Sequence, residues 1–380
     1  MSPTTAAGGG AERVLLDHQR FLDRSRFEPV IAVLGQGTFA EEAKSLGIEV
    51  YVAGPHSDRQ PLATARELYN FGRFVRDRRI DVLVGNKYRS IFYWGLSQAR
   101  RRPFVWLLHD PLPQAGLHRK VLATVTDQLR PSHTVWVTPE SSESYGQRFP
   151  HLLQSSSQIR PGTCPEDLIE GADAQRARRR WGIPVDAPIA AMFARMQESK
   201  GHLDLVHAAA TVLKEYPETR FLLCGGTLPN MDPSHETNVK RAIAELGVSD
   251  RVLTLGIISE EEKKDILAAS TLLVHPAVWE PFGIAVIEGM AVGKPVVVAD
   301  ARGPGLIVEH GQTGLVVPRS QPAALAEGIS RLLRDPELAR EMGERGAERV
   351  RERYHARVAT KRLEDIFDGL PPLAASAGAG

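Results

Sequence analysis

Two glutamates on either side of a glycine turn are the residues of this chain best suited to chemistry. Glu280 and Glu288 are separated by seven residues that include the turn Pro281-Phe282-Gly283. An apolar segment of helical length, Ile284–Ala291, follows the turn. Backbone N–H groups at a helix start lack intrahelical partners and favour an anion such as phosphate. Glu288 would lie about one and a half turns into that helix, where its carboxylate could accept hydrogen bonds from sugar hydroxyls. The pattern predicts a sugar-nucleotide site.

Two cations stand at the end of another predicted strand. Arg195 follows the apolar run Ile189–Phe193, and Lys200 precedes the predicted helix His202–Glu215. Arg offers a planar fork of donors and Lys a compact charge, so together they could neutralise a departing diphosphate. The N–H groups near Phe282, Gly283 and Ile284 could share this role. Because the sequence contains no Asp-x-Asp triplet, we expect neither a metal ion nor another cofactor.

The segment His275–Pro318 resembles the donor-binding motif of retaining glycosyltransferases of family 4, which have the two-domain GT-B fold. It keeps the two glutamates, the Phe-Gly turn, and a downstream Gly303-Pro304 and Gly311-Gln312-Thr313-Gly314 in the family's order. One departure concerns Gly305-Leu306, where the family often carries a glutamate. The resemblance implies an enzyme that moves a sugar from a nucleoside-diphosphate sugar to an acceptor.

The resemblance also implies roles for individual residues. Arg195 and Lys200 would contact the diphosphate, Glu280 the donor sugar and Glu288 the ribose. Gly225 fits the family's glycine turn after the strand Phe221–Cys224. The family implies a front-face reaction in which a phosphate oxygen of the leaving group helps to deprotonate the acceptor. A double displacement with Glu280 as nucleophile stays open.

The first half of the chain contributes a glycine-rich loop and a histidine. Gly9 and Gly10, followed by Ala-Glu-Arg-Val, resemble the family's loop at the start of the first helix. His109 follows the apolar run Phe104–Leu108, where a neutral ring could bind a sugar hydroxyl, and a capping or core histidine is the alternative. His275 is interpreted as structural. The family has a central strand before the loop, whereas only Met1–Ala7 precede it here. We therefore expect a truncated start, which would leave the neighbouring strands without ladder partners.

Short apolar runs alternate with longer amphipathic stretches along both halves of the chain. This alternation predicts parallel sheets covered by helices, arranged as two doubly wound, Rossmann-like α/β domains that face each other across a cleft. We expect domains at 1–165 and 166–352, a helix at 353–369 that crosses back to the first domain, and a frayed tail at 370–380. The acidic stretch Glu166–Asp173 is interpreted as a connector, and Leu117–Leu129 as a helix.

Composition limits the partners, the metal sites and the cellular location that the chain can have. A chain of 380 residues with 42% hydrophobic residues is long enough for two cores, and a net charge of +1 argues against nucleic acid as a partner. Cys164 and Cys224 lack metal-ligand spacing, so neither a disulfide framework nor a zinc site is expected and the cytoplasm is the expected location. The basic runs Arg100–Arg102 and Gln175–Trp181 leave open a weak contact with the inner face of a membrane. The oligomeric state stays open.

The sequence thus predicts a retaining, metal-independent glycosyltransferase (EC 2.4 type) whose acceptor is a glycan, a lipid or a small molecule. The alternatives are a nucleotide-sugar epimerase of the same fold and a non-catalytic nucleotide-sugar-binding protein. The sequence does not favour a dinucleotide oxidoreductase, because no Gly-x-Gly-x-x-Gly follows a predicted strand.

Overall fold

The computed structural model describes residues 10–33, 35–53, 61–87, 90, 102–112, 124, 126–128, 130–228 and 231–371. The chain divides into two compact units, Met1–Pro161 with Ala356–Gly380, and Gly162–His355. The predicted Gly9, most of the predicted helix Leu117–Leu129 and nearly all of the predicted tail lie outside the described residues. Among the described helices, none has both the length and the apolar character needed to cross a membrane.

The second unit is built on one parallel sheet. In spatial order its strands are β12 (Leu315–Val317), β11 (Val296–Ala299), β10 (Leu272–His275), β7 (Ile189–Phe193), β8 (Arg220–Cys224) and β9 (Val252–Gly256). The order runs one way from β7 to β9 and the other way from β10 to β12, which makes this unit a doubly wound α/β domain.

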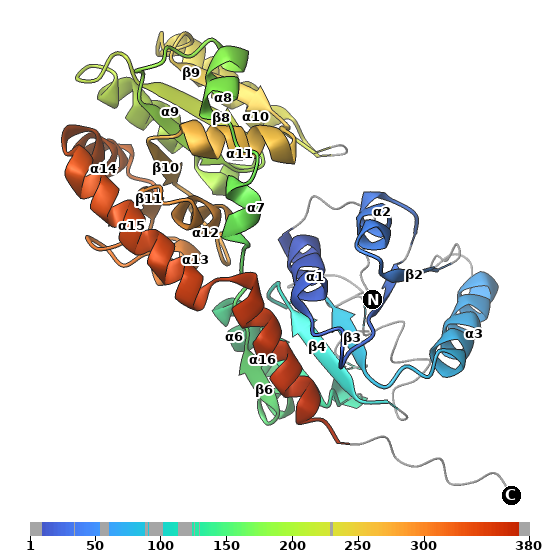
Figure 1. Ribbon diagram of the computed structural model, residues 1–380. Helices are drawn as coiled ribbons and strands as arrows, with labels where there is room; N and C mark the ends of the chain where they lie inside the picture. Colours follow the sequence, from blue (N-terminus) through green and yellow to red (C-terminus); the bar gives the residue numbers. More distant parts are fainter. Residues whose placement is uncertain are drawn as a thin grey trace, which may run out of the picture. The chain divides into compact units, whose positions relative to one another are not determined.

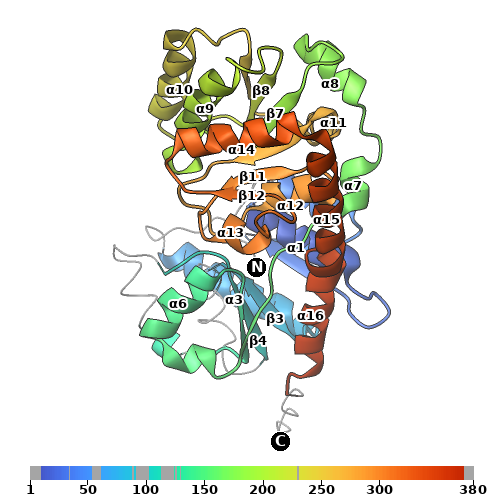
Figure 2. The same ribbon diagram turned by 90° about the vertical axis from the view of Figure 1, so that its left-hand side faces the viewer.

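Helices cover both faces of this sheet because its strands are apolar on both sides (Figure 2). In β7, Ala190 and Met192 point to one face, while Ile189 and Ala191 point to the other. The first face carries α9 (His202–Val212), α10 (Ser234–Glu245) and α14 (Pro322–Arg334). The second face carries α7 (Pro165–Ile169), α8 (Ala174–Trp181), α11 (Glu260–Ala269), α12 (Ile284–Ala291), α13 (Gly303–Ile307) and the C-terminal part of α15 (Pro336–Arg353).

The start of α11 is fixed by a capping box. Ser259 Oγ accepts a hydrogen bond from the N–H of Glu262 at 3.2 Å, and Glu262 Oε2 accepts one from the N–H of Ser259 at 2.7 Å. Such reciprocal caps satisfy two amides that the helix itself cannot, and losing the cap side chain costs about 1 kcal/mol. Because the cap sets where α11 begins, it also sets the position on the helix of the next residue, Lys263, which faces the candidate site.

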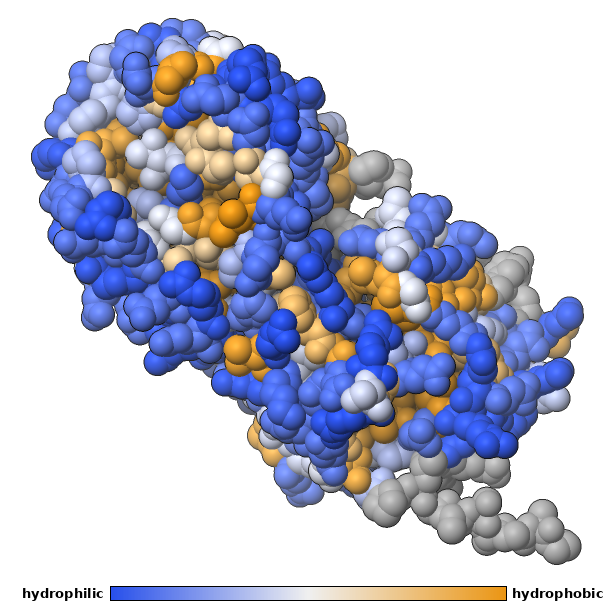
Figure 3. Space-filling model, viewed as in Figure 1, coloured by the Kyte–Doolittle hydropathy of each residue, from blue (hydrophilic) through white to orange (hydrophobic). Residues whose placement is uncertain are grey.

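The described strands of the first unit form two parallel sheets. One contains β1 (Val30–Val33) and β2 (Glu49–Val52), and the other β3 (Leu83–Asn86), β4 (Phe104–Leu108), β5 (His133–Trp136) and β6 (Ser156–Gln158). The helices of this unit are α1 (Gly10–Phe21), α2 (Thr38–Ser45), α3 (Pro61–Asp77), α6 (Pro139–Arg148) and α16 (Ala356–Asp368). In Figure 3 apolar side chains are visible on the face of this unit between α1 and α3.

The strand β4 forms the core of the larger sheet. On one face, Val105 and Leu107 pack with Leu363 of α16. On the other, Trp106 meets Tyr145 of α6 edge-on, with ring centroids 5.7 Å apart. Helix α16 also packs against α1 (Figure 1), and the two helices share a buried hydrogen-bond contact of 3.1 Å between His18 Nδ1 and Thr360 Oγ1.

Part of the predicted connector is helical. We interpreted Glu166–Asp173 as a connector, and its first half lies in the helix α7 (Pro165–Ile169). Proline at the first helical position and acidic residues in the first turn both favour a helix start, and they outweigh the polar composition.

Candidate active site

The order in which strands are added to the sheet of the second unit reverses between β7 and β10, its two central strands. In open parallel sheets, ligands bind beyond the carboxyl ends of the strands at such a switch point. The loop after β7 carries Arg195 and ends in the 3₁₀ turn Glu198–Lys200, and the loop after β10 carries Glu280. The topology therefore brings together cations and a carboxylate that are far apart in the sequence.

Backbone contacts hold these two loops side by side. The N–H groups of Val278 and Trp279 donate to the carbonyl oxygen of Ser199 at 2.9 and 3.3 Å. Gly201 has φ +76°, and a Cβ atom there would lie 2.1 Å from the carbonyl oxygen of Pro276. Only glycine permits this backbone approach, so the residue after Lys200 is fixed by geometry.

Lys200 and Glu280 form a largely buried ion pair. Lys200 Nζ lies 2.7 Å from Glu280 Oε2, and the two side chains are 12% and 16% exposed. The Nε2 atom of His275 lies 3.4 Å from the same oxygen, without the alignment of a hydrogen bond. Burial acts to raise the pKa of Glu280, but His275 and Lys200 outweigh it and lower the pKa to about 2. Glu280 is therefore ionised at neutral pH.

The turn after Glu280 leads directly into α12. The N–H of Phe282 is 3.4 Å from Glu280 Oε1, and Gly283, with φ +105°, is the N-cap of α12. The first-turn amides of an α-helix have no intrahelical acceptors, and the helix dipole makes this end positive. Ile284 and its neighbours thus place a positive helix start next to the Lys200–Glu280 pair.

Glu288 lies farther along α12 and is held by a lysine of the neighbouring helix. Its Oε1 atom is 2.9 Å from Lys263 Nζ, and the two side chains are 13% and 17% exposed. Burial acts to lower the pKa of Lys263, but Glu288 outweighs burial and raises it. Sequence reasoning missed Lys263, because helical spacing gives no signal for a contact between α11 and α12.

Arg195 and Gly225 occupy neighbouring strand-end loops. Arg195 is exposed and forms no ion pair within the described part of the chain. Gly225 has φ +132°, and a Cβ atom there would lie 2.1 Å from the carbonyl oxygen of Ala194. A side chain at position 225 would separate the loops after β7 and β8, so this position requires glycine. Arg195 is thus an exposed cation on the same loop as the paired Lys200.

The loop after β11 completes the backbone around Glu280. The N–H of Gly303 donates to the carbonyl oxygen of Glu280 at 3.1 Å, and a Cβ atom on Gly303 would lie 2.4 Å from the carbonyl oxygen of Phe282. The preceding residue, Arg302, is exposed and has φ +46°, an uncommon backbone conformation for a non-glycine residue. Strained positions of this kind concentrate at ligand-binding loops.

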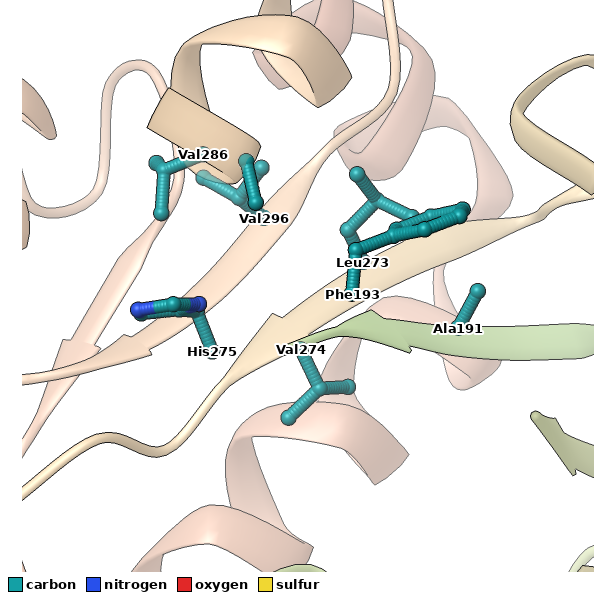
Figure 4. A pocket seen from close by; sticks show the side chains of 8 residues that line it. Ala191, Phe193, Leu273, Val274, His275, Val286 and Val296 are labelled. Atoms are coloured by element: carbon teal, nitrogen blue, oxygen red, sulfur yellow. The ribbon is translucent and has the colours of Figure 1, made fainter. Parts of the chain in front are cut away.

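An apolar layer supports these charged groups. Figure 4 shows Ala191, Phe193, Leu273, Val286 and Val296 around one small space between β7, β10, β11 and α12. His275, at the carboxyl end of β10, is the polar member of this group. His275 is the last residue of β10 and comes before the loop that carries Glu280. Its place at a strand end next to the glutamate loop was the signal that sequence analysis left unused.

In the first unit, His109 follows β4 and is 8% exposed. Its Nε2 atom lies 2.7 Å from Asn86 Oδ1, at the end of β3. Burial, together with the charges of Lys87 and His18, lowers the pKa of His109 to about 3. The ring is therefore neutral at physiological pH and donates to the amide oxygen.

The same end of the first unit holds an ion pair. Lys87, directly after Asn86, lies with its Nζ atom 2.7 Å from Oε1 of the fully buried Glu12 in α1. Gly10 is the first residue of α1. The described part of the glycine-rich segment is thus linked to the His109 region through Glu12, Lys87 and Asn86, three residues that sequence analysis did not assign to the site.

The structure brings the predicted site residues into two groups, one in each unit. The second unit gathers Lys200, Glu280, Phe282, Gly283 and Ile284, with Glu288 further along the same helix, and holds Arg195 and Gly225 on adjoining loops. The first unit holds Gly10 and His109.

Comparisons with known proteins show the family of this chain. The family described as "Glycosyl transferases group 1" matches residues 173–349, and "Glycosyltransferase Family 4" matches residues 8–151. A D-inositol 3-phosphate glycosyltransferase of Corynebacterium efficiens is 34% identical over 86% of this chain and 81% of its own length. The C. glutamicum protein of that name is 32% identical over 92% and 89%, while that of C. urealyticum matches 57% of this chain and 51% of its own length at 31% identity.

Solved structures share the fold at lower sequence identity. Anabaena HepE in complex with UDP and glucose has a TM-score of 0.82 at 22% identity and covers 97% of this chain and 98% of its own. A sucrose-phosphate synthase from Thermosynechococcus elongatus has a TM-score of 0.75 at 21% identity, covering 97% and 95%. These likenesses show the GT-B architecture that the sequence predicted. By its family matches, its relatives and its fold, the chain belongs to the family 4, group 1 glycosyltransferases and is a glycosyl-transferring enzyme.

Proposed function

We propose that this enzyme transfers a sugar from a nucleoside-diphosphate sugar to an acceptor hydroxyl, with retention of configuration and without a metal ion. The observation that carries the proposal is the Lys200–Glu280 pair, which lies at the switch point beside the start of α12. This arrangement supplies positive charge for a diphosphate and a carboxylate for the sugar next to it. His109 of the first unit would contribute a neutral hydrogen-bonding group to sugar recognition.

The diphosphate would be bound by three sources of positive potential. These are Lys200, the exposed Arg195 and the first-turn amides of α12. Lys200 and the helix amides are fixed before the reaction, so they can stabilise the charge that grows on the leaving diphosphate without reorganising, and the exposed Arg195 adds a second cation. Two side-chain cations and a helix start can replace the divalent ion that many transferases use, which is why we propose metal independence.

In the proposed reaction, the bond between the anomeric carbon and the phosphate oxygen breaks while the acceptor oxygen bonds to the same face of that carbon. The acceptor proton passes to an oxygen of the departing nucleoside diphosphate. Glu280, ionised and held by Lys200, would stabilise positive charge at the anomeric carbon. Its low pKa, about 2, makes it a weak nucleophile, which favours this role over a double displacement.

The relatives suggest which substrates to test first. HepE binds UDP and UDP-glucose, and the named activity of the curated relatives concerns D-inositol 3-phosphate. We propose UDP- and GDP-sugars as the first donors and D-inositol 3-phosphate as the first small-molecule acceptor. Glycan and lipid acceptors form the second panel.

The test is release of nucleoside diphosphate from each donor, with and without acceptor, in the presence of EDTA. We expect acceptor-dependent release and a product with the anomeric configuration of the donor. Glu280→Ala should lower kcat about 100- to 1,000-fold, the range for loss of one preorganised electrostatic group. Glu288→Ala should mainly raise the KM for the donor, since a ribose contact is present in both ground and transition states.

The matched control is Glu348→Ala, an exposed glutamate of α15, which should leave both constants unchanged. Wild-type kinetics in both site variants would refute the assignment of the site. Turnover that stops in EDTA and returns with one divalent ion would refute metal independence. Donor binding without release would favour a nucleotide-sugar-binding role, and interconversion of donor sugars without acceptor would favour an epimerase.

A further inference from the structure

Three side chains with metal-binding chemistry meet in the second unit, far from each other in sequence. Cys164 precedes α7, Glu166 lies in its first turn, and His355 follows the C-cap of α15. Cys164 Sγ is 3.0 Å from Glu166 Oε2, and His355 Nε2 is 3.4 Å from the same oxygen. All three donor atoms lie within 4.8 Å of one another, and no other described residues form such a group.

The backbone fixes the two segments that carry these side chains. The N–H of Thr163 donates to the carbonyl oxygen of Tyr354 at 2.8 Å, and Thr163 and His355 form a parallel β-bridge. Cys164 is buried, and the side chain of His355 is 15% exposed, whereas that of Glu166 is 69% exposed. The cluster is therefore positioned by the fold and reaches solvent on the side of Glu166.

We propose that Cys164, Glu166 and His355 bind a zinc ion, with water as the fourth ligand. Thiolate, imidazole and carboxylate are the side-chain ligands of Zn²⁺. Tetrahedral coordination at the usual bond lengths separates sulfur from oxygen by about 3.6 Å and nitrogen from oxygen by about 3.3 Å. The observed separations from the Glu166 oxygen are 3.0 and 3.4 Å, and sulfur and nitrogen lie within 4.8 Å of each other, so binding requires the cysteine and histidine side chains to close around the ion.

The donor set distinguishes zinc from the commoner divalent ions. Mg²⁺ and Ca²⁺ prefer oxygen ligands, whereas a thiolate with an imidazole suits Zn²⁺. Binding of the ion displaces the thiol proton of Cys164, which leaves to solvent.

The site lies next to both places where the chain passes between the units, Pro161–Gly162 and His355–Ala356. A zinc ion would cross-link, by coordination, the segment of Cys164 and Glu166 to the segment of His355 within the second unit. Its ligands are separate from the residues proposed to bind the sugar donor, so the ion takes no part in bond breaking. This inference holds whether or not the proposed donor chemistry is correct. It also departs from the expectation drawn from cysteine spacing, because His355 reaches Cys164 only through the fold.

The test uses the full chain, stripped with EDTA, moved into metal-free buffer and titrated with Co²⁺, a spectroscopic substitute for Zn²⁺. We expect one ion per chain, tetrahedral cobalt absorption and a thiolate-to-cobalt charge-transfer band in the near ultraviolet. Addition of Zn²⁺ should displace the cobalt. Cys164→Ser should abolish the charge-transfer band, and His355→Gln should weaken Zn²⁺ binding by more than about 100-fold, beyond the loss usual for an outer-shell partner.

The matched control is Cys224→Ala, which changes the other buried cysteine and should keep both the band and the affinity. Glu166→Gln alters an exposed side chain and should fold normally, so it tests the site even where Cys164→Ser does not fold. We expect at least about tenfold weaker binding in this variant. The proposal is overturned by absent stoichiometric binding, by a band that depends on Cys224, or by unchanged affinity in the Glu166 variant.

Discussion

The two units place different chemistry at the carboxyl ends of their strands. The second unit has one continuous sheet, and its switch point holds two ion pairs, Lys200–Glu280 and Lys263–Glu288. In the first unit the described strands form two sheets, and the same end holds His109 against an amide, next to one ion pair, Lys87–Glu12. We propose a division of labour in which the second unit binds the anionic diphosphate and the neutral His109 of the first unit recognises an uncharged hydroxyl.

We expect the largest effect from a variant that separates the loops after β7 and β10 in the second unit. Gly201→Ala places a Cβ atom against the carbonyl oxygen of Pro276, at 2.1 Å in the present backbone, in a conformation with φ +76°. We expect the second unit to lose more than about 3 kcal/mol of stability, together with all measurable turnover. Hydrogen exchange of β7 and β10 amides measures the stability of this unit by itself.

Gly182→Ala provides the matched control for that variant. Gly182 also has a positive φ, +63°, but a Cβ atom there would meet nothing within 4 Å. It should cost about 1 kcal/mol and leave turnover unchanged. Equal effects of the two variants would show that the approach of the two loops is not what holds the site.

A second prediction uses pH to separate the charged site from the neutral one. Because the pKa of His109 is lowered to about 3 in the folded chain, its neutral form stabilises the native state. This contribution is complete above pH ~6.5, the unfolded pKa, and is lost at up to about 1.4 kcal/mol per pH unit as the pH falls toward the folded value. Glu280 behaves differently, since its folded pKa of about 2 lies below its unfolded value of 4.5. Its contribution is complete above pH ~4.5 and is lost only below it.

The measurement is the free energy of opening of β4 amides in the first unit, determined by hydrogen exchange between pH 7 and pH ~4.5. In the wild-type chain the free energy of opening should fall as the pH falls. In His109→Gln it should fall less steeply, and the difference between the two slopes should correspond to about one proton. Glu280→Gln should not change the slope over this interval. A His109→Gln variant with the wild-type slope would contradict the buried neutral imidazole.

The smallest predicted effect on stability concerns the exposed cation of the second unit. Arg195→Ala removes an exposed side chain with no ion pair among the described residues, so stability should change by less than about 0.5 kcal/mol. Turnover should nevertheless fall about 10- to 100-fold, because the guanidinium would act on the developing diphosphate charge. Arg179→Ala, another exposed arginine of the same unit, should change neither property. An unchanged kcat in Arg195→Ala would contradict a role for Arg195, and the diphosphate site would then consist of Lys200 and the first-turn amides of α12.

Much of the fold was predictable because buried parallel strands are short apolar runs between turns. Phe104–Leu108 and Ile189–Phe193 were predicted with the observed bounds, as was the helix Ile284–Ala291. The strand Ser156–Gln158 was missed because its three polar residues carry no apolar signal, and only pairing with β5 makes it a strand. Likewise, Pro139–Arg148 was missed although Thr138 forms a capping box at its start.

The charge partners in the site could not be read from the sequence. Glu280 and Glu288 stood out by spacing, whereas their lysine partners are fixed by contacts between different strand-end loops and helices. His275 and Asn86 acquire their contacts in the same way, from the order of the strands. Spacing identifies residues that act within one loop or helix, and topology decides which of them meet.

The most direct measurement is isothermal titration calorimetry with UDP, GDP and ADP, all in EDTA. It tests whether the second unit alone binds the diphosphate through positive charge. We expect heat of binding with at least one of these nucleotides, both in the wild-type chain and in His109→Gln. Binding should be at least about tenfold weaker in Lys200→Ala, which removes a cation and leaves Glu280 to repel the phosphates. Absence of heat with all three nucleotides, or an equal loss in the His109 and Lys200 variants, would contradict this assignment to the second unit.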